Sequence, residues 1–417
     1  MIPLAWEELS ALELGALEGG GMITAIRADS REVGPGELFV AINAGTGFVG
    51  DAQARGAATL VPDDQETALA ALASLVRSKS AAQVVAVVGS AGKTTTKDIL
   101  GALCAPHAPT IWAEKSLNNE IGLPLTVCRL EPETKIMVTE MGMRGLGQVA
   151  ALCAIARPTV TVIPHIGPEH LELLGSVERV AEANAEAIVA LPAGGTAVVP
   201  ATADVLDPYL LRGDVTFRRF DAGHVEREDD ATRFIVGDQH VELELPFSQH
   251  HLALNTLAAL HAYDALGLPL DGAHEGLRGL RLSPWRGEEI PLPGGGFVVN
   301  DAYNANPDSM RAALEHLAER AGERRKIAIL GEMAELGDAS AAYHRDIGRL
   351  AAELGIEVIG VGEPARLYDP AAWAPTRDEA LARARAYLEP GDAVLVKASR
   401  AVGLEGFAGE IANFARA

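Results

Sequence analysis

The sequence has little cysteine, few aromatic residues and a shortage of basic charge. Only three of its 417 residues are cysteines, Cys104, Cys128 and Cys153, and none stands in a C-x-x-C spacing. A disulfide framework and a structural zinc site are therefore not expected, and a reducing compartment such as the cytoplasm fits best. With 35 Lys and Arg against 57 Asp and Glu, the net charge of −22 disfavours non-specific binding to nucleic acid or anionic membranes.

Long apolar runs are missing as well. No run approaches the roughly 20 residues that cross a bilayer. The segment Met1–Glu8 has no basic stretch followed by an apolar one, so a secretory signal is not expected. At about 150 residues per domain, the length of the chain predicts two or three domains.

Short β-branched runs alternate with Ala- and Leu-rich stretches of helical periodicity. This alternation predicts an α/β protein built on parallel sheets with crossover helices. A polar stretch at residues 77–80 and a Pro- and Gly-rich region near residue 282 predict two boundaries. We therefore expect three domains, over residues 1–81, 82–281 and 282–417. Within the second, residues 204–244 are more polar and alternating, which predicts an antiparallel appendage.

One loop carries a phosphate-binding pattern. Gly89-Ser90-Ala91-Gly92-Lys93-Thr94-Thr95-Thr96 follows an unbroken apolar strand at residues 84–88 and precedes an amphipathic helix. Small residues let backbone N–H groups approach an anion, and the helix N-terminus adds partial positive charge. Lys93 is placed to neutralise the β- and γ-phosphates, and the Thr94 hydroxyl can ligate Mg²⁺. The strict Walker pattern has glycine where Val87 stands, so a Gly-rich strand–helix turn is the alternative to a nucleotide-phosphate site.

Several further islands, taken together, resemble the Mur ligases, which are ATP-dependent amide-forming enzymes of peptidoglycan synthesis. They are residues 116–124 (SLNNEIGLP), 301–310 (DAYNANPDSM), 330–337 (LGEMAELG) and 396–400 (VKASR). The island at 301–310 is the most specific. It resembles the branch that joins D-alanyl-D-alanine to UDP-N-acetylmuramoyl-tripeptide. The D-x-A-H-x-P and D-N-P-R motifs of the branch that adds the third peptide residue do not occur.

The resemblance implies an architecture and a chemistry. It implies a first domain that binds the UDP-linked peptide, a central P-loop ATPase domain and a C-terminal Rossmann-like ligase domain. ATP and Mg²⁺ are the implied cosubstrate and metal, and UDP-N-acetylmuramoyl-tripeptide and D-alanyl-D-alanine are the implied partners. The tripeptide carboxylate would attack the γ-phosphate, and the dipeptide amine would attack the resulting acyl phosphate. A cytoplasmic monomer is expected, without nucleic acid and without membrane insertion.

By resemblance, the ATP site draws on three parts of the chain. Its residues are Gly89, Ser90, Ala91, Gly92, Lys93, Thr94, Thr95 and Asn119, then Asn255, and then Arg286, Asp301, Tyr303, Asn304 and Asn306. Two of them have simpler alternatives. Asn306 directly before Pro307 is also typical of a helix N-cap. Asn255 can be an ordinary polar residue of the amphipathic helix expected over residues 252–266.

Three residues are expected to be catalytic, namely Lys93, Glu140 and His170, with Thr94, Glu140 and His170 as Mg²⁺ ligands. Glu140 ends an apolar strand, and a buried carboxylate favours a metal or lysine partner. His170 stands in an H-L-E context that resembles the metal-proximal histidine of the family. A lone histidine is more often structural, which is the alternative here.

Substrate contacts are expected at both ends of the chain. Ser30 and Arg31 lie in a D-S-R segment that resembles the one holding UDP in the family. Lys397 and Arg400 end the last strand, where they can neutralise phosphate or a substrate carboxylate; a solvated basic pair is the alternative.

The clearest departure from the family is Asn184. The resemblance places it where these enzymes typically carry a carbamylated lysine that helps to hold a second Mg²⁺. Asparagine cannot be carbamylated, and its amide oxygen is a weaker ligand for a hard cation than a carboxylate. We expect this second Mg²⁺ to be held through His170, water and substrate phosphate instead.

Other function classes stay open on the sequence alone. A folylpolyglutamate synthase or another Mur-type ligase would share the phosphate loop but differ at residues 301–310. A P-loop kinase or nucleotide switch would turn over ATP without a dipeptide. A non-enzymatic binding module is disfavoured because phosphate, metal and closing-domain motifs occur together.

Overall fold

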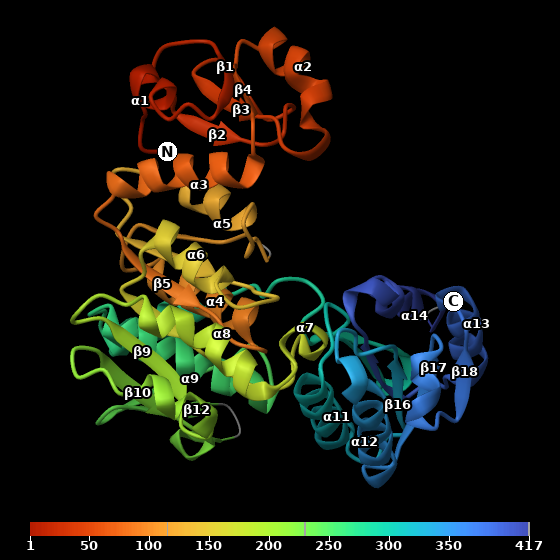
Figure 1. Ribbon diagram of the computed structural model, residues 1–417. Helices are drawn as coiled ribbons and strands as arrows, with labels where there is room; N and C mark the ends of the chain where they lie inside the picture. The colour runs from red at the N-terminus through yellow and green to blue at the C-terminus, as the bar shows by residue number, and fades with distance from the viewer. Residues whose placement is uncertain (115, 229–230, 416–417) are drawn as a thin grey trace. The chain divides into compact units, whose positions relative to one another are not determined.

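The computed structural model describes residues 1–114, 116–228 and 231–415 (Figure 1). The chain forms two compact units. Unit 1 comprises Met1–His165, Glu182–Pro246 and Leu254–Leu280, and unit 2 comprises Ile166–Ala181, Phe247–Ala253 and the chain from Arg281 onward. Among the described residues, no helix combines the length and the apolar character needed to cross a membrane.

Unit 1 begins with a four-stranded sheet in the order β1-β4-β3-β2. The strands are β1 (Gly15–Glu18), β2 (Ala25–Arg27), β3 (Glu37–Val40) and β4 (Ala58–Pro62), and the helices are α1 (Trp6–Ser10), α2 (Val49–Ala54) and α3 (Gln65–Ser78). Only β1 runs antiparallel to its neighbour. The helix α3 begins where Asp64 accepts a hydrogen bond from the Thr67 N–H, which is the N-cap expected of an aspartate there.

The rest of unit 1 is built on a six-stranded sheet in the order β10-β9-β8-β5-β7-β6, in which every pairing is parallel. Its strands are β5 (Gln83–Val87), β6 (Thr110–Trp112), β7 (Ile136–Glu140), β8 (Val160–Val162), β9 (Thr196–Pro200) and β10 (Thr216–Phe220). The residues from Val84 to Val88 are fully buried, as an unbroken apolar run in a parallel sheet predicts. The accompanying helices are α4 (Lys93–Cys104), α5 (Gly122–Val127), α6 (Gln148–Ala156), α8 (Val177–Val189), α9 (His250–Ala265) and α10 (Ala273–Leu277).

The expected antiparallel appendage is present, but it is smaller than residues 204–244. The strands β11 (Val225–Arg227), β12 (Thr232–Val236) and β13 (Gln239–Leu243) form an antiparallel sheet of their own. The strand β10 lies inside the same stretch and instead extends the parallel sheet beside β9. The polar alternation of β10 arises because an edge strand has a more exposed face, so the pattern alone did not reveal its parallel pairing.

Unit 2 carries a second six-stranded sheet in the order β14-β15-β19-β16-β17-β18, with β14 alone antiparallel. The strands are β14 (Glu288–Pro291), β15 (Phe297–Asn300), β16 (Lys326–Leu330), β17 (Ile356–Val361), β18 (Ala372–Ala374) and β19 (Ala393–Lys397). The helices are α7 (Leu171–Leu174), α11 (Pro307–Ala321), α12 (Ser340–Glu353), α13 (Arg377–Tyr387) and α14 (Phe407–Ala415).

Side chains alternate along these strands between two buried cores. Ala393 and Leu395 of β19 join the core under α11 and α12, whereas Val394 and Val396 join the core under α13 and α14. Figure 1 shows the two pairs of helices on opposite sides of the sheet. A sheet covered on both faces by helices is the layered α/β arrangement that the sequence predicted.

Candidate active site

The phosphate loop lies at the carboxyl end of β5, between that strand and the N-terminus of α4. Since β5 has neighbours on both sides, β8 and β7, the loop opens at the place where ligands of parallel sheets gather. Gly89 and Gly92 have φ values of 117° and 77°. A Cβ atom on Gly89 would lie 2.7 Å from the His165 carbonyl oxygen, and one on Gly92 would lie 2.5 Å from the Asn255 Oδ1 atom. Both glycines are therefore required by backbone conformation and by space.

Contacts from other segments hold this loop. The Ser90 N–H donates to the His165 carbonyl at 3.0 Å, and the Gly89 N–H donates to the Asn184 side chain at 2.6 Å. The Lys93 ammonium donates to the Gly89 carbonyl oxygen. Lys93 is the first residue of α4, and the N–H groups of a first helical turn point out of the helix end, where an anion meets the positive end of the helix dipole.

Glu140 ends β7, the strand beside β5, and its register partner is Val87. The side chain is 2 % exposed. Its Oε1 atom accepts a 2.8 Å hydrogen bond from the Asn118 amide, and its Oε2 atom is buried with no hydrogen-bond partner among the residues that the structure describes. An unpaired buried carboxylate oxygen is costly. The geometry therefore suits a cation at this sheet edge.

A magnesium ion fits these residues. Thr94, in the first turn of α4, is 2 % exposed, and Glu140 offers its unpaired oxygen. Mg²⁺ commonly binds through one or two protein oxygens plus water and substrate phosphate. Within the described stretches, no three His, Cys, Asp or Glu side chains gather into a group able to hold a metal without such help.

Asn118 is a site residue that the sequence interpretation missed, although it stands directly before the predicted Asn119. Asn119 is exposed, and its side-chain oxygen accepts the Gly122 N–H at 2.9 Å, at the start of α5. In this structure Asn119 thus stabilises a helix start, and its contact with ATP stays a prediction. Asn255 lies on α9, is 8 % exposed and directs its amide against Gly92.

His170 lies in unit 2, just before α7, and its φ of 50° is unusual for a residue with a side chain. Its Nδ1 atom forms an ion pair with Glu335, whose φ is 62°. The Glu335 carbonyl also accepts the Glu172 N–H at 3.1 Å. Glu335 belongs to the 330–337 island, so this island holds the histidine segment; the metal-ligand role of His170 stays a prediction.

The end of β19 and the loop after β15 meet in unit 2. The Lys397 ammonium is 2 % exposed and donates to the Asp301 carboxylate at 2.6 Å and to the Asn304 carbonyl at 3.0 Å. The Asn306 side chain accepts the Ser309 N–H at 2.9 Å and caps α11, with Pro307 as the first helical residue. The helix-cap prediction for Asn306 is thus confirmed, and its nucleotide contact is untested.

A group of cations and aromatic rings lies close to this loop. The Arg286 guanidinium lies 4.0 Å from the centre of the Tyr303 ring. The Arg400 guanidinium lies 5.4 Å from the same ring and 5.1 Å from the Trp285 ring, and it forms a 3.1 Å ion pair with Glu405. Arg286 and Tyr303, two predicted ATP contacts, therefore lie together with Arg400, a predicted substrate contact.

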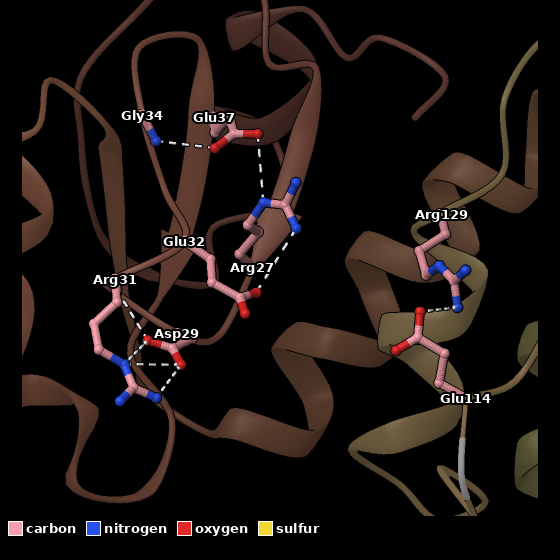
Figure 2. A network of polar contacts seen from close by, with 8 residues as sticks. All are labelled: Arg27, Asp29, Arg31, Glu32, Gly34, Glu37, Glu114 and Arg129. Carbon is pink, nitrogen blue, oxygen red and sulfur yellow. Dashed lines mark hydrogen bonds and ion pairs between the residues drawn. The ribbon is translucent and has the colours of Figure 1, made fainter. Parts of the chain in front are cut away.

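Arg31, one of the two predicted UDP-side residues, lies in a polar network just after β2 (Figure 2). Ser30 is 7 % exposed, whereas the Arg31 side chain is 83 % exposed. The Arg31 guanidinium donates hydrogen bonds to both carboxylate oxygens of Asp29. These hydrogen bonds lower the pKa of Asp29 to about 2. Figure 2 also shows Arg27 bonded to Glu37 at 3.4 Å. Arg31 is thus an accessible cation that a phosphate could reach.

Three groups of predicted residues are therefore assembled. The phosphate loop, Glu140 and Asn255 lie together in unit 1; Asp301, Asn304 and Lys397 lie together in unit 2, near Arg286, Tyr303 and Arg400. The first group combines an anion-binding loop, a lysine and a carboxylate of which one oxygen has no hydrogen-bond partner among the described residues. Such a site can bind a nucleotide phosphate with a divalent cation and stabilise charge that develops during phosphoryl transfer.

Comparison with known proteins agrees with this geometry. Residues 87–263 match the model of the Mur ligase middle domain, and residues 285–400 match that of the Mur ligase glutamate ligase domain. The UDP-N-acetylmuramoyl-tripeptide–D-alanyl-D-alanine ligase of Escherichia coli (strain K12) is 32 % identical over 394 residues, which cover 87 % of each chain.

Solved structures extend the likeness to the whole fold. The MurF structure from Acinetobacter baumannii superposes with a TM-score of 0.86 at 27 % identity, covering 100 % of this chain and 99 % of that one. The MurF ligase from Thermotoga maritima, determined in complex with ADP, has a TM-score of 0.81 at 26 % identity, covering 94 % and 98 %. This three-domain α/β fold, the two domain matches and the shared sequence lead to one conclusion: the chain belongs to the Mur ligase family.

Proposed function

We propose that this chain joins D-alanyl-D-alanine to UDP-N-acetylmuramoyl-tripeptide in an ATP-dependent reaction of peptidoglycan precursor synthesis. The observation that carries the proposal is the phosphate loop at the end of β5, with Lys93 in it and the unpaired Glu140 oxygen on the neighbouring strand. The 32 % identity with a UDP-N-acetylmuramoyl-tripeptide–D-alanyl-D-alanine ligase over 87 % of the chain supports this choice of substrates.

The reaction proceeds by two transfers. A carboxylate oxygen of the tripeptide attacks the γ-phosphorus, ADP leaves, and an acyl phosphate forms. The free amine of the dipeptide then attacks the acyl carbon, inorganic phosphate leaves, and the amine loses a proton as the amide forms. Lys93 neutralises charge on the transferring phosphoryl group, and the loop N–H groups orient the nucleotide.

Magnesium fits this site through Thr94 and Glu140, with His170 as the proposed third protein ligand. When bound, the ion supplies positive charge to the phosphate oxygens. The chain contributes the positions of these ligands. Asn118 holds one oxygen of Glu140, so the other oxygen is directed away from that bond. Glu335 likewise holds the His170 ring.

The residues assigned to the nucleotide divide between unit 1 and unit 2. We propose that the two units close on the nucleotide, since closure also shields the acyl phosphate from water. The proposed domains are residues 1–81 for the UDP-linked peptide, 82–281 for ATP and 282–417 for ligation. Solution scattering with and without ATP analogue and Mg²⁺ should show a decrease in the radius of gyration; identical dimensions would argue against closure.

The proposed setting is the cytoplasm, where the enzyme acts as a monomer. Cys104, Cys128 and Cys153 are buried free thiols, which suits a reducing compartment. Ser30 and Arg31 are proposed to contact the UDP portion, and Arg400 a substrate anion.

The test measures phosphate release from ATP with UDP-N-acetylmuramoyl-tripeptide, in the presence and absence of D-alanyl-D-alanine. We expect sustained release only when both substrates are present. Release that ignores the dipeptide would contradict the proposal and favour a kinase or a nucleotide switch. UDP-N-acetylmuramoyl-dipeptide in place of the tripeptide serves as the substrate control.

A further inference from the structure

Asn184 lies on the inner face of α8 and is 1 % exposed, between the fully buried Ala183 and Ala185. Its side-chain oxygen accepts the Gly89 N–H at 2.6 Å across a separation of 95 residues. Two residues further along α8, Glu186 has a different task, since its carboxylate accepts the N–H groups of Gly147 and Ala150 at the start of α6. Asn184 thus links α8 to the phosphate loop.

The backbone of Gly89 is held on both sides of its Cα atom. Asn184 accepts its N–H, and the Lys93 ammonium donates to its carbonyl oxygen. Gly89 also has a φ of 117° and lies so near the His165 carbonyl that no side chain fits. A residue in a backbone conformation that few residues adopt needs such fixed partners, because the N–H would otherwise be buried without an acceptor.

Asn184 cannot take the role of the carbamylated lysine that the family resemblance implies at this position. It has no amine to carry a carbamate, and its oxygen already accepts a loop N–H. The structure therefore supports no reaction step through a carbamate in this chain. The residue faces the loop that binds phosphate, which gives it a different function.

We infer that Asn184 is a positioning residue of the phosphate loop, which fixes the Gly89 peptide and thereby the nucleotide-binding shape of the loop without any bicarbonate-derived group. The inference rests on the proposed function only in taking the loop ligand to be a nucleotide phosphate. Removing the acceptor leaves the Gly89 N–H unsatisfied and lets the loop adopt other conformations, so nucleotide affinity falls.

The test compares Asn184→Leu, a similar-sized side chain without an acceptor, with Thr161→Val as matched control. The Thr161 hydroxyl is fully buried and donates to the Ala187 carbonyl of the same helix at 2.9 Å, away from the loop. Each variant loses one buried hydrogen bond to or from α8. Calorimetric titration with ADP and Mg²⁺ should show a dissociation constant raised roughly tenfold in Asn184→Leu, the scale of one lost buried hydrogen bond, and raised less than about twofold in Thr161→Val.

A second readout follows the loop itself. Hydrogen exchange of the Gly89 amide should be slow in the wild type and in Thr161→Val, and fast in Asn184→Leu. Equal ADP affinities in Asn184→Leu and the wild type, or equal losses in both variants, would overturn the inference. Binding of ADP is measured without the tripeptide and the dipeptide, so failure of the proposed ligase activity would leave this result standing or falling on its own.

One further test uses the wild-type protein alone. Its turnover at fixed pH should be the same in CO₂-stripped and in bicarbonate-supplemented buffer. If Asn184→Leu does not fold, this comparison of buffers and the exchange rate of the wild-type Gly89 amide still test the inference about Asn184. A loss of activity that bicarbonate restores, or a rapidly exchanging Gly89 amide, would contradict the inference.

Discussion

Two lysines follow inner strands of the two six-stranded sheets, and the chain uses them differently. Lys93 begins α4 after β5, and Lys397 ends β19. Lys93 is half-buried, and its ammonium donates to an uncharged acceptor, the Gly89 carbonyl. Lys397 is 2 % exposed and donates to the Asp301 carboxylate at 2.6 Å. The same position in a sheet therefore does not give the same chemistry.

The difference follows from what each lysine would lose on meeting a phosphate. A phosphate would offer the Lys93 ammonium an anionic acceptor beside the uncharged Gly89 carbonyl, which is favourable. Lys397 is itself buried and would have to leave its Asp301 partner, and an unpaired buried charge is strongly destabilising. We therefore expect Lys93 to act on the nucleotide and Lys397 to order the loop that carries Asp301 and Asn304. The earlier prediction that Lys397 contacts substrate is untested, and its pairing favours the indirect role.

The largest expected effect is that of Lys93→Ala. Turnover should fall at least ~10²-fold, the scale for deleting one electrostatic donor from a preorganised site. The melting temperature should change little, because Lys93 is only half-buried and lies at the start of α4 rather than in the buried core. Phosphate release and thermal unfolding measure the two quantities. A folded variant that keeps more than a tenth of the wild-type rate would contradict the role of Lys93 at the nucleotide and, with it, the contrast with Lys397.

Lys397→Met should act mainly on stability. We expect a loss of about 2 kcal/mol in the free energy of unfolding, below the range for fully buried pairs because the Asp301 side chain is 19 % exposed. Denaturant unfolding measures it, and the double variant with Asp301→Asn should recover part of the loss. If the single variant is as stable as the wild type and only its substrate KM rises, Lys397 contacts the substrate directly.

Asn118→Ala tests whether Asn118 orients Glu140 beside the phosphate loop. The variant removes the hydrogen bond that holds one oxygen of Glu140. The Mg²⁺ concentration for half-maximal activity should rise roughly tenfold, as for other residues that orient metal ligands. Thr126→Val is the matched control: it loses a buried 3.0 Å hydrogen bond to the Gly122 carbonyl in α5, outside the proposed site, and its Mg²⁺ requirement should stay at the wild-type value. Equal responses of the two variants would refute the role given to Asn118.

The smallest expected effect concerns the protonation of His251, whose pKa is lowered in part by the charge of Lys397. Burial lowers the pKa of His251 to about 4; Asp301 opposes this, and Lys397, His316 and His250 add to it. Below its ordinary pKa of about 6.5, the unfolded histidine binds a proton that the folded one does not. The stability present above that pKa is therefore lost as the pH falls from 6.5 towards 4.

Denaturant unfolding at about pH 7 and pH 5.5 tests this linkage. The loss of unfolding free energy between these pH values should be about 1 kcal/mol smaller in His251→Gln than in the wild type. Lys93→Ala should show the wild-type pH dependence, since Lys93 is not among the charges that shift His251. A His251→Gln curve parallel to the wild-type curve would show that His251 titrates normally.

Local patterns predicted much of this molecule. The apolar run at residues 84–88 corresponds to β5 and the residue after it, and Asn306 with Pro307 begins α11, because burial and capping leave their signal within a few neighbouring residues. The strand, glycine-rich loop and helix pattern located the phosphate loop, and the resemblance of motifs located the residues that cluster around Tyr303.

Contacts between distant segments could not be predicted in the same way. The bond from Asn118 to Glu140 spans 22 residues, and that from Gly89 to Asn184 spans 95. Helical periodicity shows that a residue faces inward, but not which loop it meets there. The partner of His170, Glu335, and the burial of Lys397 against Asp301 likewise depend on how the strands are ordered in space.

The central claim, that the loop around Lys93 transfers phosphate to a carboxylate, is tested most directly by an oxygen label. The tripeptide is prepared with ¹⁸O in its terminal carboxylate and incubated with ATP, Mg²⁺ and D-alanyl-D-alanine. Since the attacking oxygen stays on phosphorus when the amine displaces it, each released phosphate should carry one carboxylate oxygen, detected by mass spectrometry. Release of phosphate that holds no label from the tripeptide would contradict an acyl phosphate and, with it, the proposed ligase mechanism.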